Sequence, residues 1–85
     1  MNIQTTKGFD RQYSKLNLKI RGQFKTKLAL FVTNPFDPTL RNHALKGKYL
    51  GYRSIDISGD VRALYTVKND IVIIFGFIGT HSQLY

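Results

Sequence analysis

Apolar residues between positions 9 and 32 recur at intervals of three or four, which places them along one side of a helix. Asn17 and Gly22 interrupt this segment with residues that are poor in a helix interior, and positions 16–21 also alternate apolar and polar residues. The pattern therefore predicts two helices that are broken near Asn17. The apolar stripe consists of Phe9, Tyr13, Leu16, Ile20, Phe24, Leu28 and either Phe31 or Val32.

The second half of the chain has the pattern of a β-sheet. Pro35 and Pro38 end the helical region in a loop, because proline lacks a backbone donor and disfavours a helical residue before it. Three segments rich in β-branched residues follow, separated by turn-forming residues, and they predict an antiparallel meander with the helices over one face. The strands extend over 50–57, 61–67 and 71–78, with turns at 58–60 and 68–70. Residues 2–6 could form an edge or first strand.

The expected fold class is α+β, with helices first and sheet second, in a single domain over residues 1–85. A chain of 85 residues has no room for a second core, which argues against folds that bind nucleotide cofactors. At 42% hydrophobic residues, the chain has enough apolar material for a globular core.

The net charge of +8 is concentrated in the first half of the chain. Residues 1–50 carry ten Lys and Arg against two Asp, whereas residues 51–85 carry three of each sign. Such a field favours a polyanion or an acidic protein as the partner, through electrostatic steering and counterion release. The alternative is that these charges only cover a solvent-exposed helix face. Charge alone does not favour either interpretation over the other.

The absence of cysteine excludes disulfides and thiolate sites, which suits a reducing cytoplasm. Residues 1–7 lack the apolar run of a signal peptide, and the longest apolar stretch, 71–75, is far shorter than the roughly 20 residues that a membrane span needs. We therefore expect a soluble, cytoplasmic protein with no membrane association.

Two histidines are the main candidates for chemistry. His43 and His81 lie in polar segments near glycines, off the apolar stripe. Histidine has an unperturbed pKa of about 6.5, so one histidine can accept a proton while another donates one. Two exposed or turn-capping histidines are the alternative. Neither H-E-x-x-H spacing nor a third soft ligand accompanies them, so we expect no metal site and no cofactor.

Of four other polar or aromatic residues, Asp60 is by itself typical of a turn, and the other three each allow a structural and a functional interpretation. Asp60 lies at the predicted turn 58–60, where aspartate commonly bonds its own backbone. Arg53 and Arg62 lie on predicted strands, where they either extend to water or direct a guanidinium at phosphate. Tyr85 is either a plug of the hydrophobic core or a surface on which a base stacks.

Four motifs follow one another in the second half of the chain: H-x-L-K-G at 43–47, G-Y-R-S at 51–54, G-D-x-R-A-L-Y at 59–65 and I-G-T-H-S-Q-L-Y at 78–85. Together they cover about half of the chain. This ordered set resembles the YafQ branch of the RelE/ParE toxin superfamily, in which the motifs occur in the same order. The first half of the chain resembles the family only in its general character, as a basic helical hairpin.

The resemblance implies a RelE-like fold and a toxin of a type II toxin–antitoxin system. Such a toxin is a ribosome-dependent, metal-independent endoribonuclease that cuts mRNA in the decoding site. The ribose 2′-hydroxyl attacks the adjacent phosphate, which leaves a 2′,3′-cyclic phosphate and a 5′-hydroxyl. The implied partners are mRNA on the ribosome and a cognate acidic antitoxin, and the toxin alone is expected to be a monomer.

The resemblance assigns proton transfer to His43 and His81, without deciding which is the base and which the acid. Asp60 matches an acidic residue that orients a histidine or joins the proton relay. Arg62 matches an arginine that contacts the scissile phosphate in several related toxins.

The remaining carried-over residues concern substrate binding. Tyr85 replaces a terminal aromatic that would stack on a base of the codon, Lys46 is a phosphate contact, and Arg53 belongs to the same substrate-binding set. The chain departs from the family at Asp56, where better-known members have a histidine. An aspartate has an unperturbed pKa near 3.9, so it cannot replace a neutral imidazole at pH 7 without a large shift.

Two other functions share parts of this pattern. A ParE-like toxin that poisons DNA gyrase by binding would have the same fold but no need of the histidine pair. A basic domain that binds RNA without cutting it would show salt-dependent binding alone.

Overall fold

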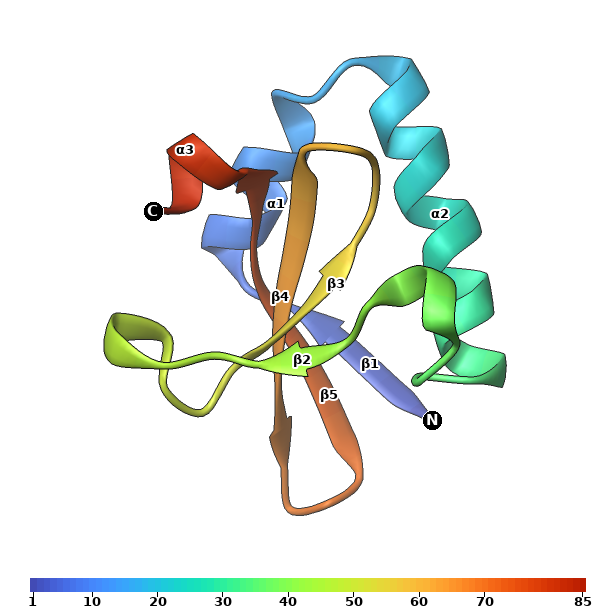
Figure 1. Ribbon diagram of the computed structural model, residues 1–85, viewed down its shortest axis with the longest axis vertical. Coiled ribbons are helices and arrows are strands. Elements are labelled where there is room, and N and C mark those ends of the chain that lie inside the picture. Colours follow the sequence, from blue (N-terminus) through green and yellow to red (C-terminus); the bar gives the residue numbers. More distant parts are fainter.

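The computed structural model describes every residue from Met1 to Tyr85 and has the expected α+β architecture, with a helical pair before most of the sheet (Figure 1). No helix in the chain combines the length and apolar character needed to cross a membrane. In chain order the elements are β1 (Asn2–Thr5), α1 (Lys7–Ser14), α2 (Leu18–Thr33), the 3-10 helix η1 (Pro38–Leu40), β2 (His43–Ala44), the 3-10 helix η2 (Gly47–Tyr49), β3 (Arg53–Asp56), β4 (Val61–Lys68), β5 (Val72–Thr80) and α3 (His81–Leu84).

The break between the two predicted helices is confirmed, and Asn17 causes it by starting the second helix. Its side-chain oxygen accepts a hydrogen bond from the backbone N–H of Ile20, at 2.9 Å, and so caps α2. Thr6 caps α1 in the same way, by accepting from Phe9 N–H at 3.0 Å. Short polar side chains favour this position because they satisfy donors that have no partner within the helix. Gly22, by contrast, lies inside α2 and does not end it.

The sheet has five strands in the order β1-β5-β4-β3-β2. The predicted meander is confirmed for β3, β4 and β5, which pair antiparallel. The sheet extends beyond this meander by one further strand at each edge. β1 pairs in parallel with β5, which is possible because the whole intervening chain serves as the crossover. β2 pairs antiparallel with β3, and its two residues are too few to show an alternating pattern.

Both long helices pack on one face of the sheet, around Phe75. The side chain of Phe75 is fully buried, and its ring lies 5.7 Å from those of Phe24 and Phe31, 6.0 Å from Phe9 and 5.6 Å from Tyr65, measured between centroids. These rings meet edge-on or tilted, which is the arrangement that aromatic quadrupoles favour. This aromatic cluster joins α1 and α2 to β4 and β5, and it is the main core of the fold.

The opposite face of the sheet is covered by a smaller apolar cluster and by α3. Tyr49, Leu64 and Leu84 are buried there together, and Tyr52 and Phe77 pack against them. Figure 1 shows α3 and the C-terminus on the other side of the strands from α2. The polar segment around His81, which follows the predicted strand 71–78, is the end of β5 followed by the short helix α3.

A β-bulge at Gly76 changes which side of β5 faces the helices. Leu64 of β4 pairs with Phe77, while the next residue, Tyr65, pairs with Phe75, so Gly76 is the extra residue. Phe75 and Ile78 therefore both face the main core, although their sequence separation is odd. A Cβ at Gly76 would lie 3.0 Å from Cε2 of Tyr52, which explains why glycine occupies this position.

The substitution Gly76→Ala should lower the free energy of unfolding by about 1–3 kcal/mol, because Tyr52 would have to move. The matched control is Gly22→Ala on α2, where an added Cβ meets nothing within 4 Å. The control should be stabilising by about 0.5–1 kcal/mol, since alanine favours a helix over glycine. Urea unfolding of both variants measures the difference, and equal stabilities would contradict the packing described for Tyr52.

Candidate active site

Five of the eight sequence-predicted site residues gather around one surface depression, of about 230 Å³. The five are His43, Asp56, Arg62, His81 and Tyr85. The lining is completed by two residues that the sequence analysis did not single out, Arg41 and Ser54. The depression lies where β2, β3 and β4 meet α3, on the sheet face away from α1 and α2.

Strand alternation brings these side chains to the same face. Ile55 and Ala63 are directly opposite each other on β3 and β4, and both are fully buried in the main core. Their neighbours Ser54, Asp56 and Arg62 therefore face the other way, because successive side chains of a strand point to opposite sides. Asp56 pairs across the ladder with Arg62, and His43 of β2 pairs with Ser54.

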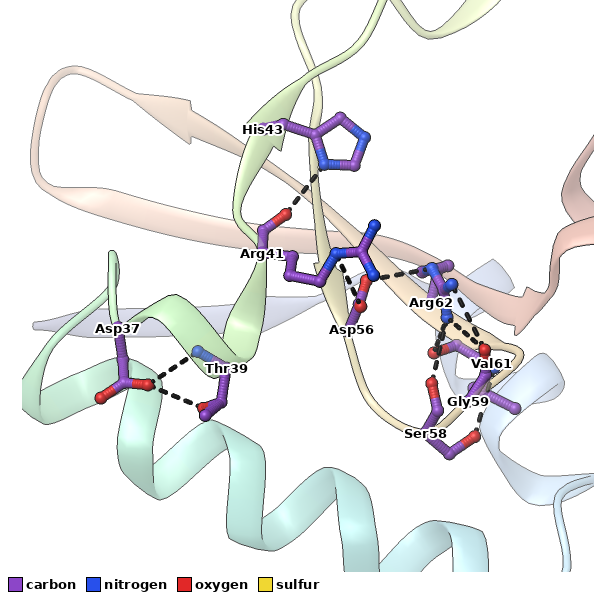
Figure 2. Close-up of polar contacts among 9 residues, drawn as sticks. All are labelled: Asp37, Thr39, Arg41, His43, Asp56, Ser58, Gly59, Val61 and Arg62. Atoms are coloured by element: carbon purple, nitrogen blue, oxygen red, sulfur yellow. Dashed lines mark hydrogen bonds and ion pairs between the residues drawn. The ribbon is translucent and has the colours of Figure 1, made fainter.

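The hydrogen bond of His43 defines its neutral tautomer. Its Nδ1 lies 2.9 Å from the backbone carbonyl oxygen of Arg41 (Figure 2). A carbonyl oxygen can only accept, so Nδ1 carries the proton and donates it. In the neutral ring Nε2 then keeps its lone pair, as a general base requires. The side chain is exposed, so a substrate can reach Nε2.

His81 is the first residue of α3, and the structure of this helix explains the G-T-H-x-Q part of the final motif. Thr80 and Gln83 form a capping box, in which Thr80 Oγ1 accepts from Gln83 N–H at 3.2 Å and Gln83 Oε1 accepts from Thr80 N–H at 2.8 Å. A Cβ at position 79 would lie 2.9 Å from Gln83 Oε1, so Gly79 leaves room for this amide. The box sets the direction in which His81 leaves the sheet.

Tyr85 packs against His81 at the edge of the depression. The two rings are stacked, with centroids 4.8 Å apart and planes inclined by 29°. Burial, followed by the neighbouring Tyr49, raises the pKa of Tyr85 above its usual value of 10.0, while Arg62 acts in the opposite direction. The phenol is therefore neutral at physiological pH. Half of the residue is exposed (51%), which leaves surface on which a base could stack.

The hydroxyl of Tyr49 anchors α3 to the rest of the molecule. It donates a 2.6 Å hydrogen bond to the backbone carbonyl of Leu84, in a buried location. Tyr49→Phe keeps the ring but leaves this carbonyl without its partner. We expect a loss of about 1–3 kcal/mol in the free energy of unfolding, with a fall in Tm.

Thermal unfolding followed by circular dichroism measures this loss. Tyr52→Phe is the matched control, because the hydroxyl of Tyr52 makes no hydrogen bond within the chain. A Tyr49→Phe variant as stable as the Tyr52→Phe variant would show that the hydrogen bond does not hold α3 in place.

Asp56 joins two arginines that differ in how firmly they are held. Its Oδ1 lies 3.0 Å from Nε of Arg62, and its Oδ2 lies 3.6 Å from Nε of Arg41 (Figure 2). Nη1 of Arg62 also donates to the carbonyls of Ser58, at 3.0 Å, and Val61, at 3.2 Å. The side chain of Arg62 is 22% exposed, whereas that of Arg41 is 76% exposed. Arg62 therefore braces the β3–β4 turn, and Arg41 extends into solvent.

Three predicted residues have side chains that do not line the depression. Lys46 is exposed in the loop before η2. Arg53 donates from Nε to Asn42 Oδ1 at 2.8 Å and lies over the ring of Phe36, at 5.3 Å. Asp60 is exposed at its turn, and it reaches the site through its backbone carbonyl, which accepts from His81 N–H at 3.3 Å.

The depression carries mixed charge, with two guanidiniums around one carboxylate, and it offers proton-transfer groups on two sides. No group of three or more His, Cys, Asp or Glu side chains is arranged to hold a metal ion. Sequence reasoning missed Arg41 because a single arginine after a proline-containing loop has no distinguishing pattern. Its position two residues before the H-x-L-K-G motif was the only signal available.

Comparison with known structures finds the same fold in bacterial toxins. YafQ from Escherichia coli BL21(DE3) superposes with a TM-score of 0.80 at 22% sequence identity, over 99% of this chain and 97% of that one. A copper-bound mutant toxin from Helicobacter pylori has a TM-score of 0.74 at 29% identity, over 100% and 99% of the two chains. YafQ in the E. coli DinJ–YafQ toxin–antitoxin complex has a TM-score of 0.76 at 22% identity, over 99% and 96%.

A search of curated proteins found no match. The family described as "Bacterial toxin of type II toxin-antitoxin system, YafQ" matches over residues 1–85. Since this match covers the whole chain, and the fold agrees with that of solved YafQ structures, the chain belongs to the YafQ family of type II toxin–antitoxin toxins.

Proposed function

We propose that this toxin is a ribosome-dependent endoribonuclease, which cuts mRNA by general acid–base catalysis and needs no metal ion. The observation that carries the proposal is the hydrogen bond from His43 Nδ1 to the Arg41 carbonyl, at 2.9 Å. It leaves Nε2 of His43 as a proton acceptor beside a depression that also contains His81. Membership of the YafQ family also supports the proposal, because toxins of this family are generally endoribonucleases.

The proposed reaction uses the two histidines on opposite sides of the scissile phosphate. His43 Nε2 takes the proton of the ribose 2′-hydroxyl, and the 2′-oxygen forms a bond to phosphorus. The bond from phosphorus to the 5′-oxygen breaks, and the leaving oxygen takes a proton from protonated His81. The products are a 2′,3′-cyclic phosphate and a 5′-hydroxyl. Negative charge develops on the phosphate during this step, and the depression contains guanidiniums that would stabilise it.

The other predicted residues have supporting parts in this proposal. The exposed part of the Tyr85 ring stacks on a base of the codon, and Lys46 contacts a phosphate from its exposed loop. Asp60 orients His81 through its backbone carbonyl. Arg53 supports the site indirectly, because it lies on the helix-facing side of β3 and holds segment 36–42, which includes Arg41, through its contacts with Asn42 and Phe36.

The proposed partners are mRNA on cytoplasmic ribosomes and an acidic antitoxin, with the toxin alone as a monomer. The net charge of +8 supports both partners, since each is negatively charged. A related toxin, YafQ of E. coli, forms a complex with the antitoxin DinJ, which supports an antitoxin as partner. Binding of a cognate antitoxin segment should weaken as salt rises, because salt screens exposed charges.

The test is cleavage of a defined mRNA on purified bacterial ribosomes, read by primer extension. The wild-type protein is compared with His81→Ala and with the control Ser82→Ala, an exposed change in the same helix. Codon-phased cuts with 5′-hydroxyl ends, present in wild type and control and absent from His81→Ala, are the expected result. If no cuts appear on ribosomes, and bacteria that express the wild type stop growing with altered DNA supercoiling, the protein is instead a gyrase poison. Salt-dependent RNA binding with neither effect would indicate a non-catalytic domain.

A further inference from the structure

Arg41 has an unusual backbone conformation at the edge of the depression. Its φ is 48°, in the left-handed region, which few residues other than glycine adopt. The other non-glycine residues with positive φ are Asn69 and Asp70, in the β4–β5 turn, and their short polar side chains suit that region. A long arginine side chain has no such advantage. An outlier of this kind is a reason to look for a function.

The surrounding structure holds this conformation from both sides. Asp37 caps η1 by accepting from Thr39 N–H at 2.9 Å, and hydrogen bonds from the side chain and backbone of Thr39 hold the pKa of Asp37 below its usual value (Figure 2). Arg41 N–H donates to the Pro38 carbonyl at 3.2 Å and so ends η1. Asn42 donates to the Tyr65 hydroxyl at 2.8 Å.

The result is that Arg41 serves the site with two different groups. Its carbonyl oxygen accepts the Nδ1 proton of His43, at 2.9 Å, and thereby orients the imidazole. Its guanidinium lines the same depression and makes one polar contact with the protein, between Nε and Oδ2 of Asp56 at 3.6 Å. The two terminal nitrogens have no partner within the chain, and the side chain is 76% exposed.

Arg62, the arginine that the motif suggests for the phosphate, is committed elsewhere. Its Nε pairs with Asp56 at 3.0 Å, and Nη1 and Nη2 both donate to the carbonyl of Gly59, at 3.4 Å. To bind a phosphate with both terminal nitrogens, it would have to release the β3–β4 turn. Arg41 can bind a phosphate with both terminal nitrogens without breaking any hydrogen bond of the chain.

We infer that Arg41 binds the scissile phosphate, and that Asp56 is a positioning residue that tethers Nε of Arg41 and leaves its two terminal nitrogens for the phosphate oxygens. A planar guanidinium fork matches two oxygens of a phosphate, and it stabilises the charge that develops there. Asp56, which stands where better-known members of the family have a histidine, then has its own role, because it connects the firmly held Arg62 to the exposed Arg41. This inference rests on the proposed ribonuclease function.

The experiment is single-turnover cleavage on ribosomes of an mRNA with one phosphorothioate at the scissile position, prepared as separate stereoisomers. Sulfur in place of the oxygen that Arg41 contacts should slow the wild type. Arg41→Ala should cut the all-oxygen mRNA about 10²–10³-fold more slowly and should lose the sulfur effect. Arg62→Ala should unfold at a lower temperature and keep the sulfur effect.

The part assigned to Asp56 is tested by combining substitutions. Asp56→Asn should reduce the sulfur effect when Arg41 is present and should change nothing further in the Arg41→Ala background, because the two residues act as a unit. An Asp56→Asn variant that lowers the rate equally in both backgrounds would overturn the positioning role.

A binding measurement separates this inference from the proposed function. The probe is mRNA with a 2′-deoxynucleotide at the scissile position, which cannot be cut, bound to ribosomes with wild-type or Arg41→Ala toxin. If the wild type cuts nothing but Arg41→Ala weakens binding at least tenfold, the ribonuclease proposal fails and the phosphate site stands. If neither cleavage nor binding depends on Arg41, or if the sulfur effect is lost in Arg62→Ala and kept in Arg41→Ala, the inference is overturned.

Discussion

Replacing His43 with alanine should slow single-turnover mRNA cleavage on ribosomes by about 10²–10⁴-fold, the usual contribution of a positioned general base. In the proposed mechanism Nε2 is the proton acceptor, because the 2.9 Å bond from Nδ1 to the Arg41 carbonyl leaves the lone pair of Nε2 free. Fold stability should change little, since His43 is exposed in a strand of two residues. The rate is measured by quenching the reaction at set times and quantifying the cut fragment.

The control for this experiment is Ala44→Ser, an exposed change at the next position that does not line the depression. It should cut at the wild-type rate. Full activity in His43→Ala, with the same melting temperature as wild type, would remove His43 from the mechanism and would shift the base to another group.

Replacing Phe75 with alanine should lower the free energy of unfolding by about 3–5 kcal/mol. Phe75 is completely buried and touches four other aromatic rings from three elements, so no neighbour can collapse easily into the space it leaves. Domains of this size are stable by only about 5–15 kcal/mol, so the loss is a large part of the total. Urea unfolding at 25 °C measures it.

Phe36→Ala is the matched control, because Phe36 is 64% exposed and its ring lies under the guanidinium of Arg53, at 5.3 Å. Its loss should stay within about 1 kcal/mol, the range of an exposed cation–π contact. A Phe75→Ala variant destabilised no more than Phe36→Ala would mean that the aromatic cluster contributes little to holding the helices on the sheet.

The parts of the fold that were predicted from sequence are those in which a local pattern and the tertiary structure agree. The apolar stripe from Phe9 to Phe31 faces the sheet, and Asn17 starts a helix because its side chain can cap one. The turns after β3 and β4 are rich in Gly, Asn, Asp and Ser, and they lie where they were expected. Each of these features is decided by a few neighbouring residues.

The features that were missed depend on contacts between distant segments. The direction of β1 is set by its place beside β5, about 70 residues later in the chain, and nothing within residues 2–5 encodes it. The helix α3 has four residues, too few for a helical period, and it is stabilised by its capping box and by the hydroxyl of Tyr49. Tyr49 is 35 residues away from its partner Leu84.

The candidate site shows the same division. The motifs identified residue types, and the structure brings five of those residues around one depression. The motifs could not reveal which guanidinium is free, because Arg62 and Arg41 differ only in the hydrogen bonds that surround them. The motifs also could not show which group of Asp60 contacts α3. The structure shows that it is the backbone carbonyl and not the side-chain carboxylate.

The two faces of the sheet divide the molecule into a scaffold and a reactive surface, and this division has a genetic consequence. Bacteria that survive expression of the toxin will carry substitutions of two kinds. Changes on the helix-facing side, at Ile55, Ala63 or Tyr65, remove the protein from the cell by exposing it to proteolysis. Changes at the neighbouring position Asp56, whose side chain faces the depression, leave an abundant but harmless protein that can still bind the antitoxin. The adjacent positions Ile55 and Asp56 of β3 should therefore give different survivors: those changed at Ile55 lack detectable protein, and those changed at Asp56 keep it.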